Sequence, residues 1–291
     1  MKTISITNHN GGVAKTATAI NLAKGLANKG FKVLIIDADP QGTTTDTISG
    51  TGNEFTNEKK ELIRKKIIDG CDRFSAFKEG LTSEDSMYDL SDVLENPEII
   101  NLAINASNFE NIDLISGTIR LDRSDKNLRD DYTRPTTLRL KEAFMHLDKK
   151  YDFVIFDNAP RNDLVVTNTL LVSDLVIVPV KCDRKSAKGF IRTIESLLVI
   201  QQRNDVDYDF RLLLQMINRN KNDSNTVNFY HEIFPEFTFK NTVRYQAKPI
   251  SDADLHKQIV IDKNNVPVAE DYRNVVNEVL EYFQMEGFDD K

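Results

Sequence analysis

A glycine-containing segment near the amino terminus has the composition of a phosphate-binding loop. Residues 8–16 read Asn-His-Asn-Gly-Gly-Val-Ala-Lys-Thr and lie between an expected strand and an expected helix. In such a position backbone N–H groups point towards an anion, and the helix dipole adds positive potential. Lys15 would supply a charge to the β- and γ-phosphates of a nucleotide, and Thr16 would offer a hydroxyl to Mg²⁺. The segment therefore predicts binding of a nucleoside triphosphate together with Mg²⁺.

The match to the strict phosphate-loop pattern is incomplete at two positions. The pattern GxxxxGK[ST] requires glycine where this chain has His9 and Ala14. If residue 14 adopts a positive φ, alanine there costs about 1 kcal/mol relative to glycine, which a folded loop tolerates. A Gly-Gly turn that only tightens a strand–helix corner is the alternative. The residues expected to contact the nucleotide through this loop are Asn10, Gly11, Gly12, Val13, Ala14, Lys15, Thr16 and Ala17.

Acidic residues follow two apolar runs further along the chain. Asp37 and Asp39 come after the run Val33–Ile36, and Asp157 comes directly after Phe153–Phe156. Ligands of doubly wound folds bind at the carboxyl ends of parallel strands, where these side chains would lie. One aspartate of the first pair could orient an attacking water while the other holds the metal shell or the loop. Asp157 could anchor a nucleotide-bound Mg²⁺ ion. A solvated Asp-rich turn and an ordinary strand-ending aspartate are the alternatives.

Short apolar runs without polar alternation indicate strands that are covered on both faces. Such runs are Val33–Ile36, Phe153–Phe156, Leu175–Val180 and Leu212–Leu214. Segments with helical spacing of apolar residues are 15–29, 136–149, 184–202 and 269–283. The alternation predicts an α/β fold, a doubly wound and mainly parallel sheet with helices on both faces. Residues from about 46 to 110 do not follow this alternation of strands and helices. We expect them to form a mostly helical insertion in a single domain spanning 1–291.

The composition of the 291 residues is that of an ordinary globular protein. Apolar residues make up 40% and charged residues 29%, which excludes disordered and fibrous proteins. The net charge of −7 argues against coating nucleic acid with the whole surface and leaves room for a local basic patch. Two distant cysteines fit neither a disulfide framework nor a CxxC metal site. No apolar run reaches the roughly 18–20 residues that span a membrane, so we expect a cytoplasmic protein without a membrane partner.

Three motifs in a fixed order, GGVAKT, DADPQG and DNAP, are shared with a known family of ATPases. In these motifs, and over most of the chain outside about 50–110, the sequence resembles the ParA/Soj/MinD group of deviant Walker A ATPases. The resemblance implies a P-loop NTPase fold in which Asp39 activates water beside its partner Asp37. It also implies that Asn218 contacts adenine. The residues across which ATP and Mg²⁺ are then expected to bind are Lys15, Thr16, Asp39 and Asp157.

The resemblance also implies partners. Members of the group form an ATP-sandwiched homodimer that binds DNA non-specifically, and a ParB-type partner stimulates hydrolysis, so that plasmids or chromosomes are segregated. We therefore expect a nucleoid-associated homodimer that works with a ParB-type protein. Basic residues on loops and strand ends near the nucleotide would give salt-sensitive DNA binding, and scattered solubilising charge is the alternative. The candidate DNA contacts are Arg219, Lys221, Lys240, Arg244 and Lys248.

The chain departs from the group at Asn10, where the group has its signature lysine. Asparagine cannot supply charge to a transferring phosphoryl group, and loss of an arginine finger, a related cation, costs roughly 10³–10⁵ in rate. Arg161 is a candidate substitute cation. A nucleotide-gated scaffold with weak or no hydrolysis is therefore an alternative function, and a MinD-like spatial regulator is a third. The pattern NKxD at 220–223 leaves GTP as an alternative nucleotide, although we expect this segment to be a polar turn.

Overall fold

The fold is that of a single mixed sheet between layers of helices. A computed structural model describes residues 1–49, 57–81, 88–247 and 258–285. In this part of the chain eight strands form one sheet in the order β3-β4-β2-β5-β1-β6-β7-β8. Every pairing is parallel except that of β3 with β4. The strands are β1 (Lys2–Ile6), β2 (Val33–Ala38), β3 (Ile104–Ala106), β4 (Ile112–Ile115), β5 (Phe153–Asn158), β6 (Leu175–Lys181), β7 (Asp209–Ile217) and β8 (Val243–Arg244).

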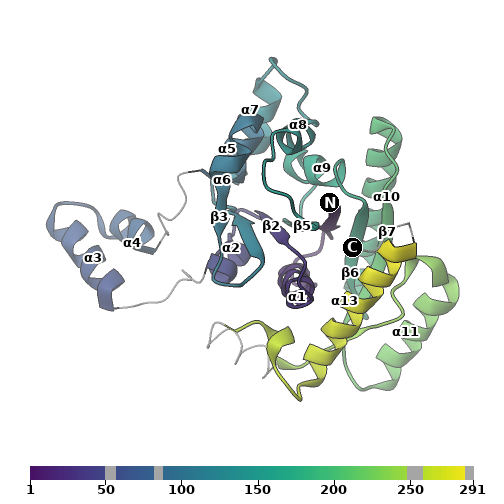
Figure 1. Ribbon diagram of the computed structural model, residues 1–291. Helices are drawn as coiled ribbons and strands as arrows, with labels where there is room; N and C mark the ends of the chain where they lie inside the picture. Colours follow the sequence, from purple (N-terminus) through teal and green to yellow (C-terminus); the bar gives the residue numbers. More distant parts are fainter. Residues whose placement is uncertain (50–56, 82–87, 248–257, 286–291) are drawn as a thin grey trace.

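Helices cover both faces of this sheet (Figure 1). The α-helices are α1 (Lys15–Asn28), α2 (Thr43–Ser49), α3 (Asn57–Ile68), α4 (Arg73–Leu81), α5 (Leu90–Glu95), α6 (Ile100–Ala103), α7 (Leu121–Asp130), α8 (Arg139–Met145), α9 (Leu164–Leu170), α10 (Arg184–Asn204), α11 (Lys221–Ile233) and α13 (Pro267–Met285). Short 3₁₀ turns are η1 (Pro97–Ile99), η2 (Pro235–Phe237) and η3 (Val260–Asp262). The doubly wound α/β fold predicted from the apolar runs is confirmed.

The core explains why the strand sequences do not alternate with polar residues. In β2, Val33 and Ile35 belong to the cluster formed with α1 and α13 on one face of the sheet. Leu34 and Ile36 belong to the cluster formed with α5, α7 and α8 on the other face. Since successive residues of a strand point to opposite faces, all four are buried.

Two regions differ in detail from the sequence-based expectation. Within 46–110 the described residues are mostly helical, and α3 packs on α4 beside the sheet in Figure 1, but β3 also adds an antiparallel edge strand. The helix expected over 136–149 is limited to α8. Thr136 is held in a turn before α8, because its carbonyl accepts a hydrogen bond from Asn168 Nδ2 at 2.8 Å.

The register of the sheet brings three strand ends together. Asp157 of β5 is aligned with Ile6 of β1 on one side and with Asp37 of β2 on the other. Because these strands are parallel neighbours, the loops that leave their carboxyl ends lie at the same edge of the sheet. The phosphate-loop segment, the DADPQG segment and the DNAP segment therefore converge there.

Candidate nucleotide-binding site

The loop between β1 and α1 has the backbone geometry of an anion-binding turn. Gly12 and Ala14 have left-handed φ values of 67° and 65°, so residue 14 does adopt the conformation that costs alanine energy. The carbonyl of Ala14 starts α1 by accepting from the backbone N and the hydroxyl of Thr18, at 3.0 and 2.7 Å. A Cβ built at Gly11 or Gly12 would meet no atom within 4 Å. The loop thus leaves open space for a phosphate near the amino end of α1.

Lys15 is held inside this loop. Its Nζ donates a hydrogen bond to the carbonyl oxygen of Asn10 at 3.1 Å, and its side chain is buried. Burial lowers the pKa of Lys15, while Asp157 and Asp39 act in the opposite direction. A compact charge that is shielded from water interacts more strongly with a phosphate than an exposed one does. The loop itself therefore fixes the position of the Lys15 ammonium group.

Asp157 provides a buried oxygen atom that lacks a partner. Its Oδ2 accepts from the Thr44 hydroxyl at 2.7 Å, and the side chains of Thr44 and Thr16 both act to lower the pKa of the carboxyl. Its Oδ1 is buried without a hydrogen-bond partner. Burial raises the pKa of Asp157 to about 6. Mg²⁺ prefers oxygen ligands and is usually bound through one or two protein groups plus phosphates, so Asp157 and Thr16 fit such an ion.

Asp37 and Asp39 have different surroundings although only one residue separates them. The buried carboxylate of Asp37 accepts from the backbone N and the hydroxyl of Thr45, both at 2.8 Å, and from Asp39 N at 3.1 Å. Burial, followed by the nearby charge of Asp157, raises the pKa of Asp37 well above its usual value. Asp39 is only half-buried, and its Oδ1 accepts from Gln41 N at 3.0 Å. Asp37 therefore holds the loop in place, whereas the carboxylate of Asp39 stays accessible.

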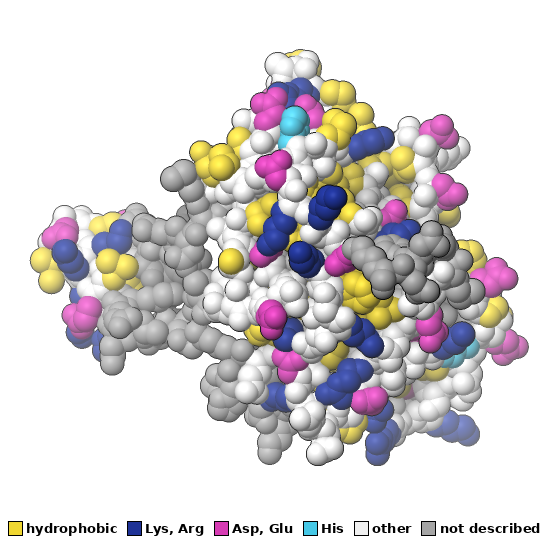
Figure 2. Space-filling model, in the orientation of Figure 1, with side chains coloured by type: hydrophobic (Ala, Val, Ile, Leu, Met, Phe, Trp, Pro, Cys, Tyr) yellow, Lys and Arg dark blue, Asp and Glu magenta, His cyan; other side chains and the backbone are white. Residues whose placement is uncertain are grey.

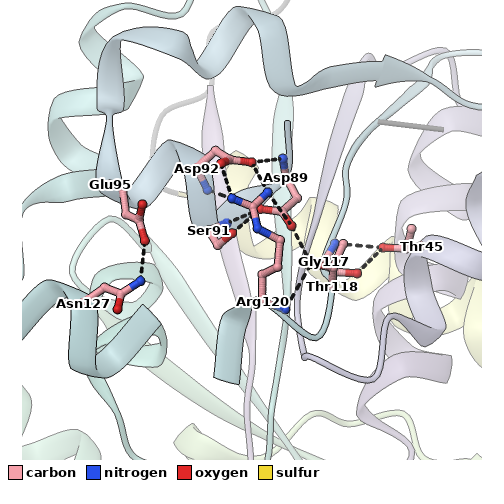
Figure 3. Close-up of polar contacts among 9 residues, drawn as sticks. All are labelled: Thr45, Asp89, Ser91, Asp92, Glu95, Gly117, Thr118, Arg120 and Asn127. Atoms are coloured by element: carbon pink, nitrogen blue, oxygen red, sulfur yellow. Dashed lines mark hydrogen bonds and ion pairs between the residues drawn. The ribbon is translucent and has the colours of Figure 1, made fainter. Parts of the chain in front are cut away.

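A hydrogen-bond network that the sequence did not predict ties this loop to the start of α5 (Figure 3). Gly117 N donates to the Thr45 hydroxyl oxygen at 2.9 Å. The next residue, Thr118, donates from its hydroxyl to the carboxylate of Asp89, which caps α5. Arg120 Nη1 lies 3.6 Å from the same carboxylate. The only sequence signal for this network is the run of threonines that follows the DADPQG segment.

The side chain of Asn10 lies against α10 of its own chain. Its Nδ2 donates to the Ser186 carbonyl at 3.4 Å, and its amide atoms fill the space beside Gly189. Arg161, considered above as a substitute cation, is ion-paired with Asp122 at 3.0 Å and Asp163 at 3.1 Å. Asn10 therefore adds no charge to the loop, and the guanidinium of Arg161 is engaged by two carboxylates.

A cavity of about 340 Å³ opens at the carboxyl ends of β6 and β7 and has Asn218 in its lining. The backbone N and the Nδ2 of Asn218 donate to Asp223 Oδ2 at 2.7 and 3.2 Å. Asp223 belongs to the first turn of α11, which Asn220 caps by accepting from Asp223 N at 2.8 Å. The expectation that 220–223 is a polar turn is therefore wrong, since α11 begins there. The cavity is within the size range of small-ligand pockets.

Two of the basic residues considered for DNA binding lie next to this cavity. Arg219, between β7 and α11, and Lys221, the first residue of α11, are both exposed. Arg244 lies at the neighbouring strand end, but its Nε and Nη2 are paired with Asp271 at 2.6 and 2.7 Å. The guanidinium of Arg244 is thus already engaged by a carboxylate.

The remaining basic residues do not extend this group. Lys240 is exposed, and it follows Phe239, which pairs with Leu212 nearer the amino end of β7. Lys248 lies outside the residues that the structure describes. In the view of Figure 2, side chains of both charges are spread over the visible face, and some of the Lys and Arg side chains lie close together near its centre. The local group is therefore Arg219 with Lys221.

The sequence of the chain matches a known protein family. Residues 1–209 match the family model described as an AAA domain. The chain is also 29% identical over 281 residues to the sporulation initiation inhibitor protein Soj of Bacillus subtilis, covering 96% of this chain and 98% of Soj. The chain belongs to the ParA/Soj/MinD family of P-loop ATPases.

Solved structures share the fold of this ParA/Soj/MinD-family protein. A plasmid partition protein from Borrelia burgdorferi bound to AMPPNP has a TM-score of 0.69 and 21% identity, covering 97% of this chain and 98% of that one. Cobyrinic acid a,c-diamide synthase from Mycobacterium smegmatis was solved with a bound ATP analogue and magnesium. It has a TM-score of 0.69 and 20% identity, covering 98% of this chain and 96% of that one. Among the residues that the structure describes, no helix is long and apolar enough to cross a membrane.

Proposed function

We propose that this chain is a partition ATPase that binds ATP with Mg²⁺ where β1, β2 and β5 end. The observation that carries the proposal is the buried, unpartnered Oδ1 of Asp157 beside Thr16 and the loop that holds Lys15. Buried polar atoms normally have a partner, and a missing one points to an ion or water that completes the site. A structural relative carries an ATP analogue with magnesium in the same fold, which supports this choice of ligand.

In this proposal each residue of the site has its own task in hydrolysis. Lys15 binds phosphate oxygens, and Thr16 and Asp157 hold Mg²⁺. The ion would neutralise charge that develops on the transferring phosphoryl group. Asp39 orients the attacking water from its accessible position. Asp37 holds the loop that carries Asp39 in place, because its carboxylate accepts hydrogen bonds from the backbone of that loop.

We further propose that the base of ATP occupies the cavity at Asn218, and that GTP is not the preferred nucleotide. In the NKxD pattern the aspartate must accept hydrogen bonds from guanine. Here one carboxylate oxygen of Asp223 already accepts two hydrogen bonds from Asn218. Competition between ATP and GTP for the site tests this, and tighter binding of GTP would contradict it.

The ATP-bound form is proposed to be a homodimer that holds DNA at the nucleoid without sequence preference. Exposed Arg219 and Lys221 support this, since lysine and arginine contacts to phosphates give binding of that kind. A ParB-type partner would stimulate hydrolysis. The net charge of −7 suits a basic segment of such a partner.

Binding to a non-specific DNA duplex tests the proposal. We would compare ATP, ADP and no nucleotide at two salt concentrations, with Lys15→Ala as the control that removes nucleotide binding. Binding only with ATP, weakened by salt and by the Arg219→Ala/Lys221→Ala double substitution, is the expected result. Equal binding in all nucleotide states, or none with ATP at the lower salt concentration, would contradict it.

A nucleotide-gated scaffold with weak hydrolysis is a second candidate, because Asn10 carries no charge and Arg161 is paired elsewhere. Restoring lysine with Asn10→Lys should then raise the turnover of bound ATP in the presence of DNA. An unchanged rate would count against the scaffold. Both candidates require the same ATP site, so nucleotide affinity does not distinguish them.

A further inference from the structure

The first residues of the phosphate-binding loop are fastened to α10. Thr193, which is buried on that helix, accepts a hydrogen bond from His9 N at 3.1 Å and donates to the Gly189 carbonyl at 2.9 Å. Its hydroxyl also lies 3.3 Å from Asn8 Oδ1, which accepts from Asn10 N at 2.8 Å. Asn8 and His9 therefore contact one hydroxyl group on a helix that follows them by more than 170 positions in the chain, and Asn10 is linked to that group through Asn8.

Asn10 fits α10 because residue 189 has no side chain. A Cβ at Gly189 would lie 2.0 Å from Asn10 Oδ1 and 2.1 Å from both its Cγ and Nδ2. Contacts below 3.0 Å essentially never occur for a real Cβ, so any other residue at 189 would displace this amide. The Nδ2 of Asn10 also reaches the Ser186 carbonyl at 3.4 Å. Asn10 and Gly189 are thus complementary in shape.

This contact is connected to the phosphate-binding charge. The backbone carbonyl of Asn10 is the acceptor for Lys15 Nζ, at 3.1 Å. The backbone of Asn10 is also tied to α10, because its N donates to Asn8 Oδ1, which lies 3.3 Å from the Thr193 hydroxyl. A shift that carries this backbone away from α10 would move the group that holds Lys15, and a displacement of about 1 Å at a binding site has large effects on function.

We propose that Gly189 and Thr193 are positioning residues for the nucleotide, acting through Asn10 and His9 of the phosphate-binding loop. The inference rests on the proposed function only in that ATP binds at Lys15. Asn10, which carries no charge, acts within its own chain by docking the loop on α10. The affinity for ATP therefore depends in part on α10, a helix outside the three motifs.

Titration of the full chain with a fluorescent ATP analogue and Mg²⁺ tests the contact between Asn10 and Gly189. Gly189→Ala should weaken binding about tenfold, which is in the usual range of coupling between linked sites. Alanine has the higher helix propensity, so a loss of affinity without loss of thermal stability is not a folding defect. In the Asn10→Ala background the same substitution should change affinity by about twofold or less, because the clashing amide is gone.

Thr193 offers an independent test by conservative replacement. Thr193→Val keeps the shape and removes the acceptor of His9 N, so binding should weaken about tenfold, whereas Thr193→Ser should retain affinity. Ile191→Ala, on the exposed side of the same helix, is the matched control and should have no effect. Equal losses from Gly189→Ala in both backgrounds, or no loss in either, would overturn the inference. Loss of ATP binding by the wild-type chain would overturn the proposed function together with it.

Discussion

Replacing Asp157 with asparagine should make the nucleotide-free protein more stable near neutral pH, although it damages the proposed site. Burial raises the pKa of Asp157 to about 6 from an ordinary value of 3.8. The folded state therefore favours the protonated carboxyl, and the charged form costs stability above that pH. The difference of about two units, at 1.36 kcal/mol per unit, gives a cost of about 3 kcal/mol. Asparagine removes the charge and keeps an acceptor for the Thr44 hydroxyl.

Urea unfolding in the presence of a chelator measures this effect. At about pH 8 the Asp157→Asn variant should exceed wild type by about 3 kcal/mol in free energy of unfolding. The difference in free energy of unfolding between variant and wild type should fall to about 1 kcal/mol at about pH 4.5, because the wild-type carboxyl becomes protonated in the folded state. Asp130→Asn, at an exposed position in α7, is the control and should leave stability unchanged. A variant that is less stable than wild type at the higher pH, or a difference in stability that does not change with pH, would show that the buried charge of Asp157 does not cost stability.

Three further predictions concern the same site. Ala14→Gly should raise the free energy of unfolding in urea by about 1 kcal/mol, because the φ of 65° is strained for alanine; a decrease would contradict the loop geometry. Thr45→Val should lower it by about 2 kcal/mol, since buried Asp37 loses a donor, while Thr45→Ser should change it little. The Mg²⁺ dependence of ATP binding should weaken as pH falls below about 6, because protonated Asp157 is a poor ligand; a flat profile in binding titrations would argue against that role.

The fold and the convergence of the three motifs could be predicted because both depend on local patterns. The apolar runs such as Phe153–Phe156 mark strands buried on both faces, and parallel strands place their carboxyl ends at one edge. That rule brings Asp37 and Asp157 side by side, as the register of β2 and β5 shows, and the loop that precedes Lys15 leaves β1 at the same edge.

The supporting contacts could not be predicted because they join residues that no local pattern relates. The hydrogen bond between Gly117 and Thr45 spans 72 positions, and the one between His9 and Thr193 spans 184. Such contacts depend on how the loops pack after the sheet has formed. The start of α11 was also missed, since an NKxD segment has the polar composition of a turn, and the cap by Asn220 is visible only in the folded chain.

Calorimetric titration of wild type and Lys15→Ala with Mg²⁺-ATP, side by side, shows whether ATP occupies the loop between β1 and α1. Lys15 is buried in the loop, where its Nζ donates a hydrogen bond to the Asn10 carbonyl. We expect saturable binding by wild type and no detectable binding by a folded Lys15→Ala variant. Retained affinity in that variant would show that ATP is bound elsewhere and would contradict the assignment of this site.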